Sequence, residues 1–388
     1  MQSTKRLDEH EGLGQLPTSW PAPARPGDPI ELVDTPALLL DLDAFERNLD
    51  SMQQAADRAK MAIRPHAKAH KTPAIALAQM ARGAVGICCQ KISESLAFLH
   101  AGVTDIHISN EIVGPVKARR LAELARHGRL SVCVDDVSQV RELAAATAAA
   151  GSTLRVFIEI NIGQNRCGVN APDDALHLLD AILSCPGLRF AGLQAYQGVL
   201  QHVRDVSARR DAVGRSARVT AGFIDAITGR GLRCETITGG GTGSVEFDLA
   251  EGIYTELQPG SYVFMDGDYG RNEQAGLRFE HSLFVATRVM SRAQIPHLIV
   301  DAGLKSLAVD SGLPLVWGDG SFDYIAANDE HGAVVSRDTG TLLPALGSML
   351  RLVPGHCDPT LNLYDHLVAF RANRVEEIWD VAARGQSR

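Results

Sequence analysis

A lysine in a short basic motif is the first residue of this sequence that could do chemistry. Lys68 lies in R-P-H-A-K-A-H-K, which spans 64–71. An apolar run precedes it, so this lysine stands at the end of an expected strand, where its amine could form a Schiff base with an aldehyde. The alternative is a solvated basic loop, and spacing alone does not choose between the two.

A glycine-rich run further along the chain could hold a phosphate group. The segment T-G-G-G-T-G-S covers 238–244. Glycines allow the backbone to approach an anion closely, and Thr and Ser hydroxyls add donors. A flexible turn is the alternative, but the concentration of glycines favours phosphate. A Schiff-base lysine and a phosphate cradle together indicate pyridoxal phosphate (PLP).

A histidine and an aspartate near the C-terminus could bind a divalent metal. His356 and Asp358 form an H-x-D pair in P-G-H-C-D-P-T. On a strand, alternation would place both side chains on one face and Cys357 on the other. An imidazole and a carboxylate suit Mn²⁺ or Mg²⁺, with Zn²⁺ as a further option. Two ligands alone are a weak signal, and a surface turn is the alternative.

The elements that must position these residues alternate between apolar runs and amphipathic segments. The apolar runs are continuous, which is typical of parallel strands buried on both faces. We expect strands at 37–42, 62–68, 85–89, 105–110, 130–136, 154–161, 188–196 and 234–240. Eight strand–helix units favour an α/β fold, a closed (β/α)8 barrel. An open doubly wound sheet is the alternative, although no G-x-G-x-x-G motif follows the first strand.

Polar residues collect where these expected strands end, which is the active-site rim of such a barrel. The rim comprises Lys68, Gln90, Asn110, Asp135, Asn161, Tyr196 and 239–242. Polar residues also end strands as turn formers or helix caps, so this pattern maps the rim without establishing its chemistry.

The 388-residue chain is long enough for two domains. After about residue 275 the helical patterns give way to short strand-like runs, and a Pro-rich segment precedes residue 37. We therefore expect an N-terminal arm (1–36) packing on a β domain, a PLP-binding barrel (37–272), and a C-terminal β domain (273–388) that carries the metal ligands.

Composition excludes several classes of function. The net charge of −8 and the lack of basic runs argue against binding to nucleic acid or to anionic membranes. No apolar stretch approaches the ~18 residues of a membrane span. The N-terminus is polar and carries acids, unlike a signal peptide. Seven cysteines without a C-x-x-C pair indicate reduced thiols and a cytoplasmic protein.

Several long motifs in this sequence resemble those of a known family. R-P-H-A-K-A-H-K, E-I-N-I-G-Q-N-R-C-G-V, L-Q-A-Y-Q-G, T-G-G-G-T-G-S, E-L-Q-P-G-S-Y-V-F-M-D, D-E-H-G and P-G-H-C-D-P-T look like the D-threonine aldolase and D-serine dehydratase group. This group has the alanine-racemase-like fold of PLP enzymes. The resemblance runs from about Asp34 to the C-terminus. It is strongest to 3-hydroxy-D-aspartate aldolases, through C-C-Q-K-I-S-E and Q-A-Y-Q-G-V-L-Q-H among others.

The resemblance implies a role for each matching residue. Lys68 matches the Schiff-base lysine, and His202 matches a histidine near the substrate hydroxyl. Arg166 matches an arginine near the phenolic oxygen of the cofactor. His356 and Asp358 match the metal ligands. The other expected cofactor-binding residues are Gln90, Tyr196, Thr238, Gly240, Gly241, Thr242, Gln258 and Tyr262.

Three positions depart from related enzymes. The dehydratases have cysteine where this chain has Asp358, and aspartate favours a harder ion and the aldolase branch. Gln197 stands where D-threonine aldolases are expected to have histidine, which removes one possible base. Gln258 stands near the position of an arginine that faces the pyridine nitrogen in alanine racemases, so the protonation of that nitrogen is open.

These features predict retro-aldol cleavage of D-3-hydroxy amino acids, with 3-hydroxy-D-aspartate giving glycine and glyoxylate. A D-threonine aldolase of broader specificity, a D-3-hydroxyaspartate or D-serine dehydratase, and a racemase are alternatives. A non-catalytic PLP-binding protein fits poorly, since such proteins are typically small single barrels. The base for the substrate hydroxyl is either His202 or a metal-bound hydroxide. The metal, Arg271 or protonated His331 could bind a second substrate carboxylate. The resemblance also implies a homodimer.

Overall fold

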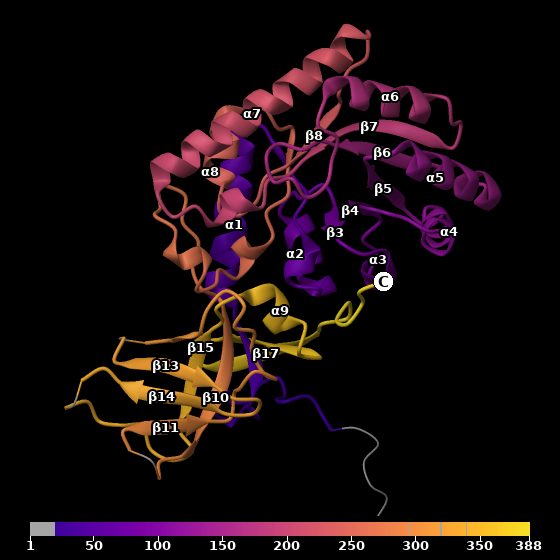
Figure 1. The fold of residues 1–388 in the computed structure, drawn as a ribbon. Helices are drawn as coiled ribbons and strands as arrows, with labels where there is room; N and C mark the ends of the chain where they lie inside the picture. Colours follow the sequence, from indigo (N-terminus) through magenta and orange to yellow (C-terminus); the bar gives the residue numbers. More distant parts are fainter. Residues whose placement is uncertain (1–19, 294, 319, 339) are drawn as a thin grey trace, which may run out of the picture.

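The chain folds into a parallel-stranded barrel with a separate β domain below it (Figure 1). The computed structural model describes residues 20–293, 295–318, 320–338 and 340–388. The segment 1–19, which holds part of the expected N-terminal arm, lies outside these residues. One large cluster of buried apolar side chains contains residues of both the barrel and the β domain.

Eight short parallel strands form the barrel wall. They are β2 (Ala62–Ile63), β3 (Ile87–Cys89), β4 (Asp105–Glu111), β5 (Arg129–Val134), β6 (Leu154–Glu159), β7 (Leu188–Ala195), β8 (Thr236–Gly239) and β9 (Glu256–Leu257). The strand order is β2-β9-β8-β7-β6-β5-β4-β3, and a parallel bridge between His66 and Cys88 joins the two ends. The (β/α)8 barrel expected from the sequence is confirmed.

Helices cover the outside of this wall (Figure 1). They are α1 (Leu42–Ala59), α2 (Pro73–Ala81), α3 (Ile92–His100), α4 (Pro115–Leu124), α5 (Val137–Ala150), α6 (Pro172–Leu183), α7 (Val206–Gly229) and α8 (Val245–Glu251). The start of α1 shows why they form: the Asp41 side chain caps the backbone N–H of Ala44. Phe45, Leu49 and Met52 then recur at helical spacing on the buried face.

The β domain is a second, mostly antiparallel sheet. Its strands are β1 (Ala37–Asp41), β10 (Leu283–Ser291), β11 (His297–Val300), β12 (Leu315–Val316), β13 (Phe322–Ala327), β14 (Gly332–Ser336), β15 (Met349–Val353), β16 (His366–Arg371) and β17 (Arg374–Asp380). The main strand order is β13-β14-β11-β10-β1-β16-β17, with β15 paired to β10 and β12. The short helix α9 (Cys357–Leu361) follows β15.

One strand that we expected in the barrel belongs to the β domain instead. β1 pairs antiparallel with β10 and parallel with β16. A continuous apolar run indicates burial on both faces, but it does not identify the sheet that buries it. The barrel's remaining place is taken by β9, whose two residues are too few to leave a hydrophobic pattern.

The described part of the N-terminal segment, 20–36, lies along the β domain. The backbone N–H of Gly27 donates to the carbonyl of Val375 at 2.8 Å, and that of Ile30 donates to Asn373 at 3.0 Å. Ile30 is buried in a second apolar cluster with Phe284 and Val375. Within the described ranges, no helix combines the length and apolarity needed to cross a membrane.

Candidate active site

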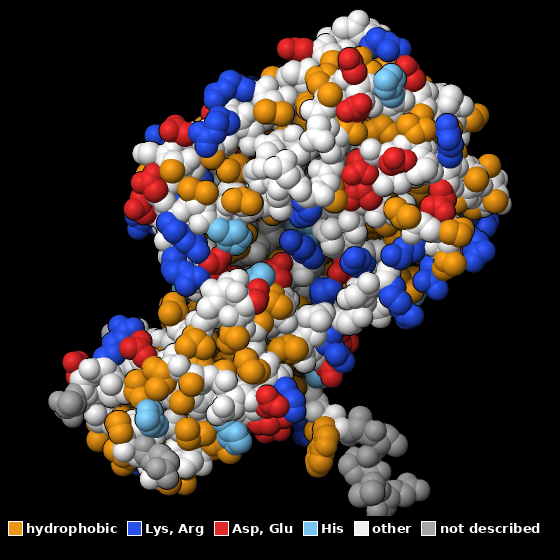
Figure 2. All heavy atoms as spheres, viewed as in Figure 1, with side chains coloured by type: hydrophobic (Ala, Val, Ile, Leu, Met, Phe, Trp, Pro, Cys, Tyr) orange, Lys and Arg blue, Asp and Glu red, His pale blue; other side chains and the backbone are white. Residues whose placement is uncertain are grey.

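A cavity of about 170 Å³ opens at the carboxyl ends of the barrel strands, beside the start of α9. In Figure 2, basic, acidic and histidine side chains gather around a hollow between the barrel and the β domain. Most residues predicted from the sequence line this cavity: Lys68, Gln90, Arg166, Tyr196, His202, Gly241, Thr242, Gln258, His356 and Asp358. The segments after the barrel strands supply all of them except the last two.

Lys68 stands on a 3₁₀ turn, Ala67–Ala69, directly after β2. Its backbone N–H donates to Nδ1 of His66 at 3.4 Å, and Nε2 of His66 lies 2.9 Å from the hydroxyl of Ser109. Burial, aided by the charge of Lys68, holds the pKa of His66 well below its usual range. The imidazole beside the lysine is therefore neutral, and the lysine amine is the reactive group at this place.

The segment after β8 offers donors to an anion. The hydroxyl of Thr242 accepts a hydrogen bond from the backbone N–H of Tyr262 at 3.0 Å, which leaves its own proton free to donate. Among the described residues, no acceptor takes the backbone N–H of Thr242 or of Gly260, which also borders the cavity. These groups suit a phosphate.

Three predicted cofactor residues lie just outside the cavity lining. Gly240 has φ +67°, and a Cβ there would come within 2.6 Å of the Asp248 carboxylate, so glycine is required by the turn. The phenol of Tyr262 is buried and accepts a hydrogen bond from Gln79 at 3.1 Å. Tyr262 therefore supports Thr242 through its backbone. Thr238 is fully buried below the rim.

Thr238 determines how Gln258 faces the cavity. The Thr238 hydroxyl donates to the Glu256 carboxylate at 2.8 Å, so it must accept the bond that joins it to Nε2 of Gln258, also 2.8 Å long. The same amide nitrogen donates to Gln194 at 2.8 Å. Because both amide protons are used, Gln258 offers only its carbonyl oxygen to a group in the cavity.

Arg166 and Tyr196 form one wall. The Arg166 guanidinium carbon lies 5.4 Å from the centre of the Tyr196 ring, a cation–π distance. Behind the wall, Nη2 of Arg166 lies 3.8 Å from the carboxylate of Glu159. On another side, the backbone N–H of Gln90 donates to the Glu94 carboxylate at 2.8 Å, which fixes the segment after β3.

His202 is oriented by a carboxylate. Its Nδ1 lies 2.5 Å from Asp268, which also receives hydrogen bonds from Arg204 and Arg271. Burial would raise the pKa of Asp268, but the hydrogen bonds from Arg271 and Arg204 outweigh it and lower that pKa. The ring packs against Tyr269 at 5.5 Å between centroids. With Nδ1 engaged, Nε2 remains as the atom that can exchange a proton.

His356 and Asp358 both reach the cavity, but not from one face of a strand as we expected. His356 caps the start of α9, and Asp358 lies in its first turn. Nδ1 of His356 lies 2.7 Å from the Asp310 carboxylate, which leaves Nε2 for another partner. Burial would lower the pKa of His356, but the carboxylates of Asp358 and Asp310 raise it. A carboxylate behind an imidazole and a second carboxylate beside it are a donor set that fits a divalent cation.

The comparisons with known proteins agree with this geometry. The alanine racemase N-terminal domain family matches residues 40–268, and the putative serine dehydratase domain family matches residues 282–370. A D-threonine aldolase of Arthrobacter sp is 53% identical over 369 residues, which are 95% of this chain and 97% of that protein.

The chain belongs to the D-threonine aldolase and 3-hydroxy-D-aspartate aldolase group of the alanine-racemase-like fold.

Two further members of this aldolase group cover nearly the whole chain. A 3-hydroxy-D-aspartate aldolase of Paracoccus denitrificans is 44% identical over 373 residues, 94% of this chain and 95% of the relative. The crystal structure of a D-threonine aldolase from Filomicrobium marinum has a TM-score of 0.93 and 50% identity, and the match covers 95% of this chain and all of that one. The chain is accordingly an enzyme of the aldolase group, a carbon–carbon lyase.

Membership in this group implies PLP, and the cavity has a partner for each of its polar substituents. Lys68 offers an amine for the aldehyde, and Arg166 offers a guanidinium for the phenolic oxygen. Thr242 and Gly260 offer backbone N–H groups for the phosphate that no acceptor in the described part of the chain takes. The residues present therefore fit the cofactor.

Sequence reasoning missed several residues that line the cavity. They are His66, Ser109, Gln194, Gly260, Ser261 and Tyr269. His66 could have been found from its place two residues before Lys68. Gly260 and Ser261 lie in the P-G-S-Y motif, in which only the tyrosine was assigned a role from the sequence. Ser109 and Gln194 lie inside strands and carry no signal without knowledge of which face points inward.

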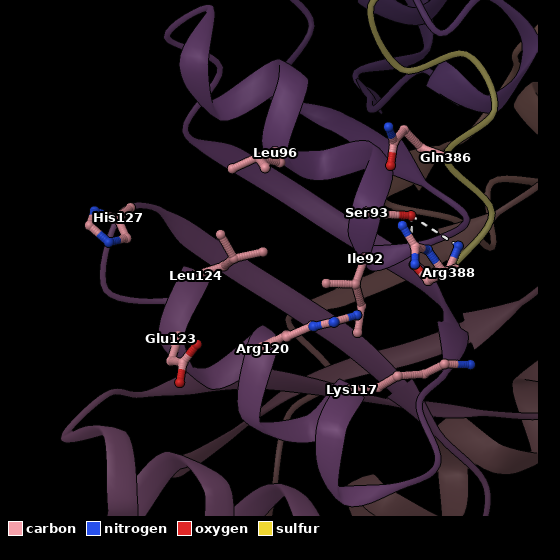
Figure 3. A pocket seen from close by; sticks show the side chains of 10 residues that line it. All are labelled: Ile92, Ser93, Leu96, Lys117, Arg120, Glu123, Leu124, His127, Gln386 and Arg388. Atoms are coloured by element: carbon pink, nitrogen blue, oxygen red, sulfur yellow. Dashed lines mark hydrogen bonds between the residues drawn. The ribbon is translucent and has the colours of Figure 1, made fainter.

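A larger cavity, of about 420 Å³, lies elsewhere, between α3, α4 and the C-terminal residues. Figure 3 shows its side chains spread around an open space, with Ser93 hydrogen-bonded to Arg388. It shares no lining residue with the cavity of Lys68, and its size alone does not connect it with the chemistry.

Proposed function

We propose that this chain is a PLP- and divalent-metal-dependent aldolase that cleaves D-3-hydroxy amino acids to glycine and an aldehyde. The observation that carries the proposal is one cavity that brings together Lys68, the His202–Asp268 pair, and His356 with Asp358. An amine for the cofactor, an oriented base and a cation site are the three parts that retro-aldol cleavage requires.

Each of these residues would have a separate role in the cleavage reaction. Lys68 would hold the cofactor through its aldehyde, and Arg166 would supply a positive charge to its phenolic oxygen. When bound, PLP supplies an electron sink for the charge left on the substrate α-carbon. His202 takes the proton of the β-hydroxyl at Nε2, and Asp268 holds the ring in that orientation. His356 and Asp358 would hold the cation, whose charge lowers the pKa of a hydroxyl beside it. The aspartate favours Mn²⁺ or Mg²⁺ over Zn²⁺.

We propose that both D-threonine and 3-hydroxy-D-aspartate are substrates. Neither Arg271 nor His331 lines the cavity, since Arg271 is directed to Asp268 and to the carbonyl of Ser311. A second substrate carboxylate must therefore find its charge partner at His202, at His356 or at the metal. This arrangement favours a broad specificity over a pocket dedicated to aspartate.

The narrower expectation, that 3-hydroxy-D-aspartate is cleaved better, stays a prediction. One charge-assisted contact contributes roughly 1.5–3 kcal/mol, so kcat/KM for 3-hydroxy-D-aspartate should exceed that for D-threonine by about tenfold or more. Equal values would remove the preference and leave the aldolase chemistry intact.

Product analysis tests the reaction itself. The purified enzyme, supplied with PLP and Mn²⁺, is incubated with D-threonine and with each stereoisomer of 3-hydroxyaspartate. Glycine with acetaldehyde or glyoxylate supports the proposal. Ammonia with an oxo acid as the main products would identify a dehydratase and overturn it, and simple inversion at the α-carbon would identify a racemase.

We propose a homodimer as the working assembly, on the strength of the family resemblance. His202 and His356 line the cavity and are partly exposed. A second β domain could cover them there. Sedimentation analysis would detect the dimer, and a monomer with full activity would contradict it.

A further inference from the structure

Two glutamates lie side by side behind the cavity wall. Glu111 ends β4 and Glu159 ends β6, with Cys133 on the strand between them. A carboxylate oxygen from each glutamate and the sulfur of Cys167 all lie within 4.8 Å of one another. Glu159 is 4% exposed. Glu111 is partly buried, with its Oε1 shielded from solvent, and two carboxylates at this separation cannot both ionise without a cost.

One carboxylate oxygen of Glu111 lacks a hydrogen-bond donor. Its Oε1 is shielded from solvent and receives no hydrogen bond from the part of the chain that the structure describes. An ionised carboxylate oxygen can only accept, so a protonated Glu159 beside it would supply the donor that Glu111 lacks. The thiols of Cys133 and Cys167 are the other titratable groups nearby, and burial raises the pKa of both.

The charges around Glu159 also favour its protonated form. Burial is the largest cause that raises its pKa, to about 8, and the negative charge of Glu111 and their hydrogen bond add to it. Arg166, with Nη2 at 3.8 Å, is the cation that opposes this rise. At neutral pH Glu159 therefore keeps its proton.

We infer that Glu111 and Glu159 share one proton behind Arg166 and act as a positioning pair for its guanidinium. One negative charge on the pair balances the single positive charge of Arg166. The guanidinium is then held between the glutamates and the ring of Tyr196, where it lines the cavity. Arg166 is the residue that touches the ligand, and the glutamates act through it.

The pair should make cofactor affinity depend on pH. This consequence rests on the proposed PLP site. PLP brings negative charge to the cavity, so its binding raises the pKa of Glu159 further. Affinity is then full below about pH 8 and falls as pH rises through the two pKa values. If binding raises that pKa by one unit, affinity at high pH is about tenfold weaker.

Infrared spectroscopy of the purified protein tests the shared proton without reference to PLP. Wild-type protein should show a protonated-carboxyl stretch that disappears as pH rises through about 8. In the difference spectrum between wild type and Glu159→Gln this band should appear, whereas the band of Asp248, whose pKa burial raises to about 7, cancels. The amide of Glu159→Gln can still donate to Glu111, so the variant keeps the neutral-pH geometry. Glu111→Gln should move the titration of Glu159 to lower pH, since it removes the neighbouring negative charge. A titrating band unchanged in Glu159→Gln would overturn the inference.

Release of PLP from diluted holoenzyme, measured between about pH 6.5 and about pH 9.5, tests the positioning role. Wild type should lose affinity about tenfold more than Glu159→Gln over this range. Glu280→Gln is the matched control, because it removes an exposed carboxylate paired with Arg47 away from the cavity, and it should behave as wild type. Equal pH dependence in wild type and Glu159→Gln would refute positioning. If the protein binds no PLP at all, the proposed function fails while the infrared result still decides the pair.

Discussion

The two sides of the cavity hold their polar groups in opposite ways. On the barrel side His66 and Glu159 are buried and neutral, since burial lowers the pKa of His66 and raises that of Glu159. On the facing side Asp268 stays ionised among arginines, and the His202 side chain is 49% exposed. The difference suits two tasks: strand ends fix a cofactor rigidly, while loops and α9 present charges to a changing substrate.

Removal of Lys68 should have the largest effect, because it breaks the barrel side of this comparison. Lys68→Ala should abolish the visible absorbance of the bound cofactor and lower turnover by roughly a thousandfold or more. Lys117→Ala is the control, since Lys117 lines the other cavity. An unchanged visible spectrum in purified Lys68→Ala protein would show that a different amine holds PLP.

Removal of the cation ligands tests the facing side of the cavity, where α9 lies. His356→Ala or Asp358→Asn should cost roughly a hundredfold in kcat/KM and abolish inhibition by chelators, while the PLP spectrum persists. His366→Ala is the control, because His366 pairs with Asp380 on the surface. A wild-type rate that survives chelation, with no gain from added Mn²⁺, would exclude the metal site.

Asp268→Asn sharpens the comparison by leaving both cofactor and cation in place. Without the carboxylate, His202 loses its fixed orientation, and kcat should fall roughly tenfold to a hundredfold. The visible spectrum should not change. Asp365→Asn removes a carboxylate paired with Arg384 on the surface and should have no effect. Full activity in Asp268→Asn would assign the proton transfer to another group.

The smallest effect is expected on stability, and it comes from two buried, neutral histidines. Burial lowers the pKa of His70 and of His107 to about 3. In the unfolded chain these rings have pKa values of about 6.5, so only the unfolded state takes up their protons below that pH. Their contribution to stability is full above about pH 6.5 and is lost as pH falls toward 3, by up to ~1.4 kcal/mol per pH unit for each ring.

Chemical denaturation of His70→Gln measures how much one such ring contributes to the pH dependence of stability. Between about pH 4.5 and about pH 6.5, its unfolding free energy should vary with pH less steeply than that of wild type, by up to one proton. His366→Gln is the matched substitution at a partly exposed histidine, which pairs with Asp380 on the surface. Parallel curves for His70→Gln and wild type would show that His70 titrates alike in both states.

The sequence predicted the barrel because continuous apolar runs and amphipathic helices are local patterns. It could not place β1, since a buried strand looks the same in either sheet. It left the backbone at His356 and Asp358 open between a strand and a surface turn, whereas a short helix begins there after β15. Both residues were nevertheless identified, because their chemistry does not depend on the element that carries them.

The pairing of Glu111 with Glu159 illustrates what sequence patterns leave out. Glu111 directly follows one expected strand and Glu159 lies within another, and a single acidic residue at either place is common. Their contact depends on β4, β5 and β6 being neighbours in register. Tyr262 shows the same limit, because its motif placed the residue correctly but not the direction of its side chain.

The position of β1 has a consequence for biosynthesis. Leu39 pairs with Phe284 on one side and with Val368 on the other, so its partners leave the ribosome long after it does. All the barrel strands are translated before β16, so the barrel can assemble while β1 still lacks one neighbour. Until translation ends, this strand exposes apolar residues and an unpaired edge, which is the condition that invites chaperone binding or aggregation. Chains truncated before β16 should therefore misassemble, even though they contain every strand of the barrel.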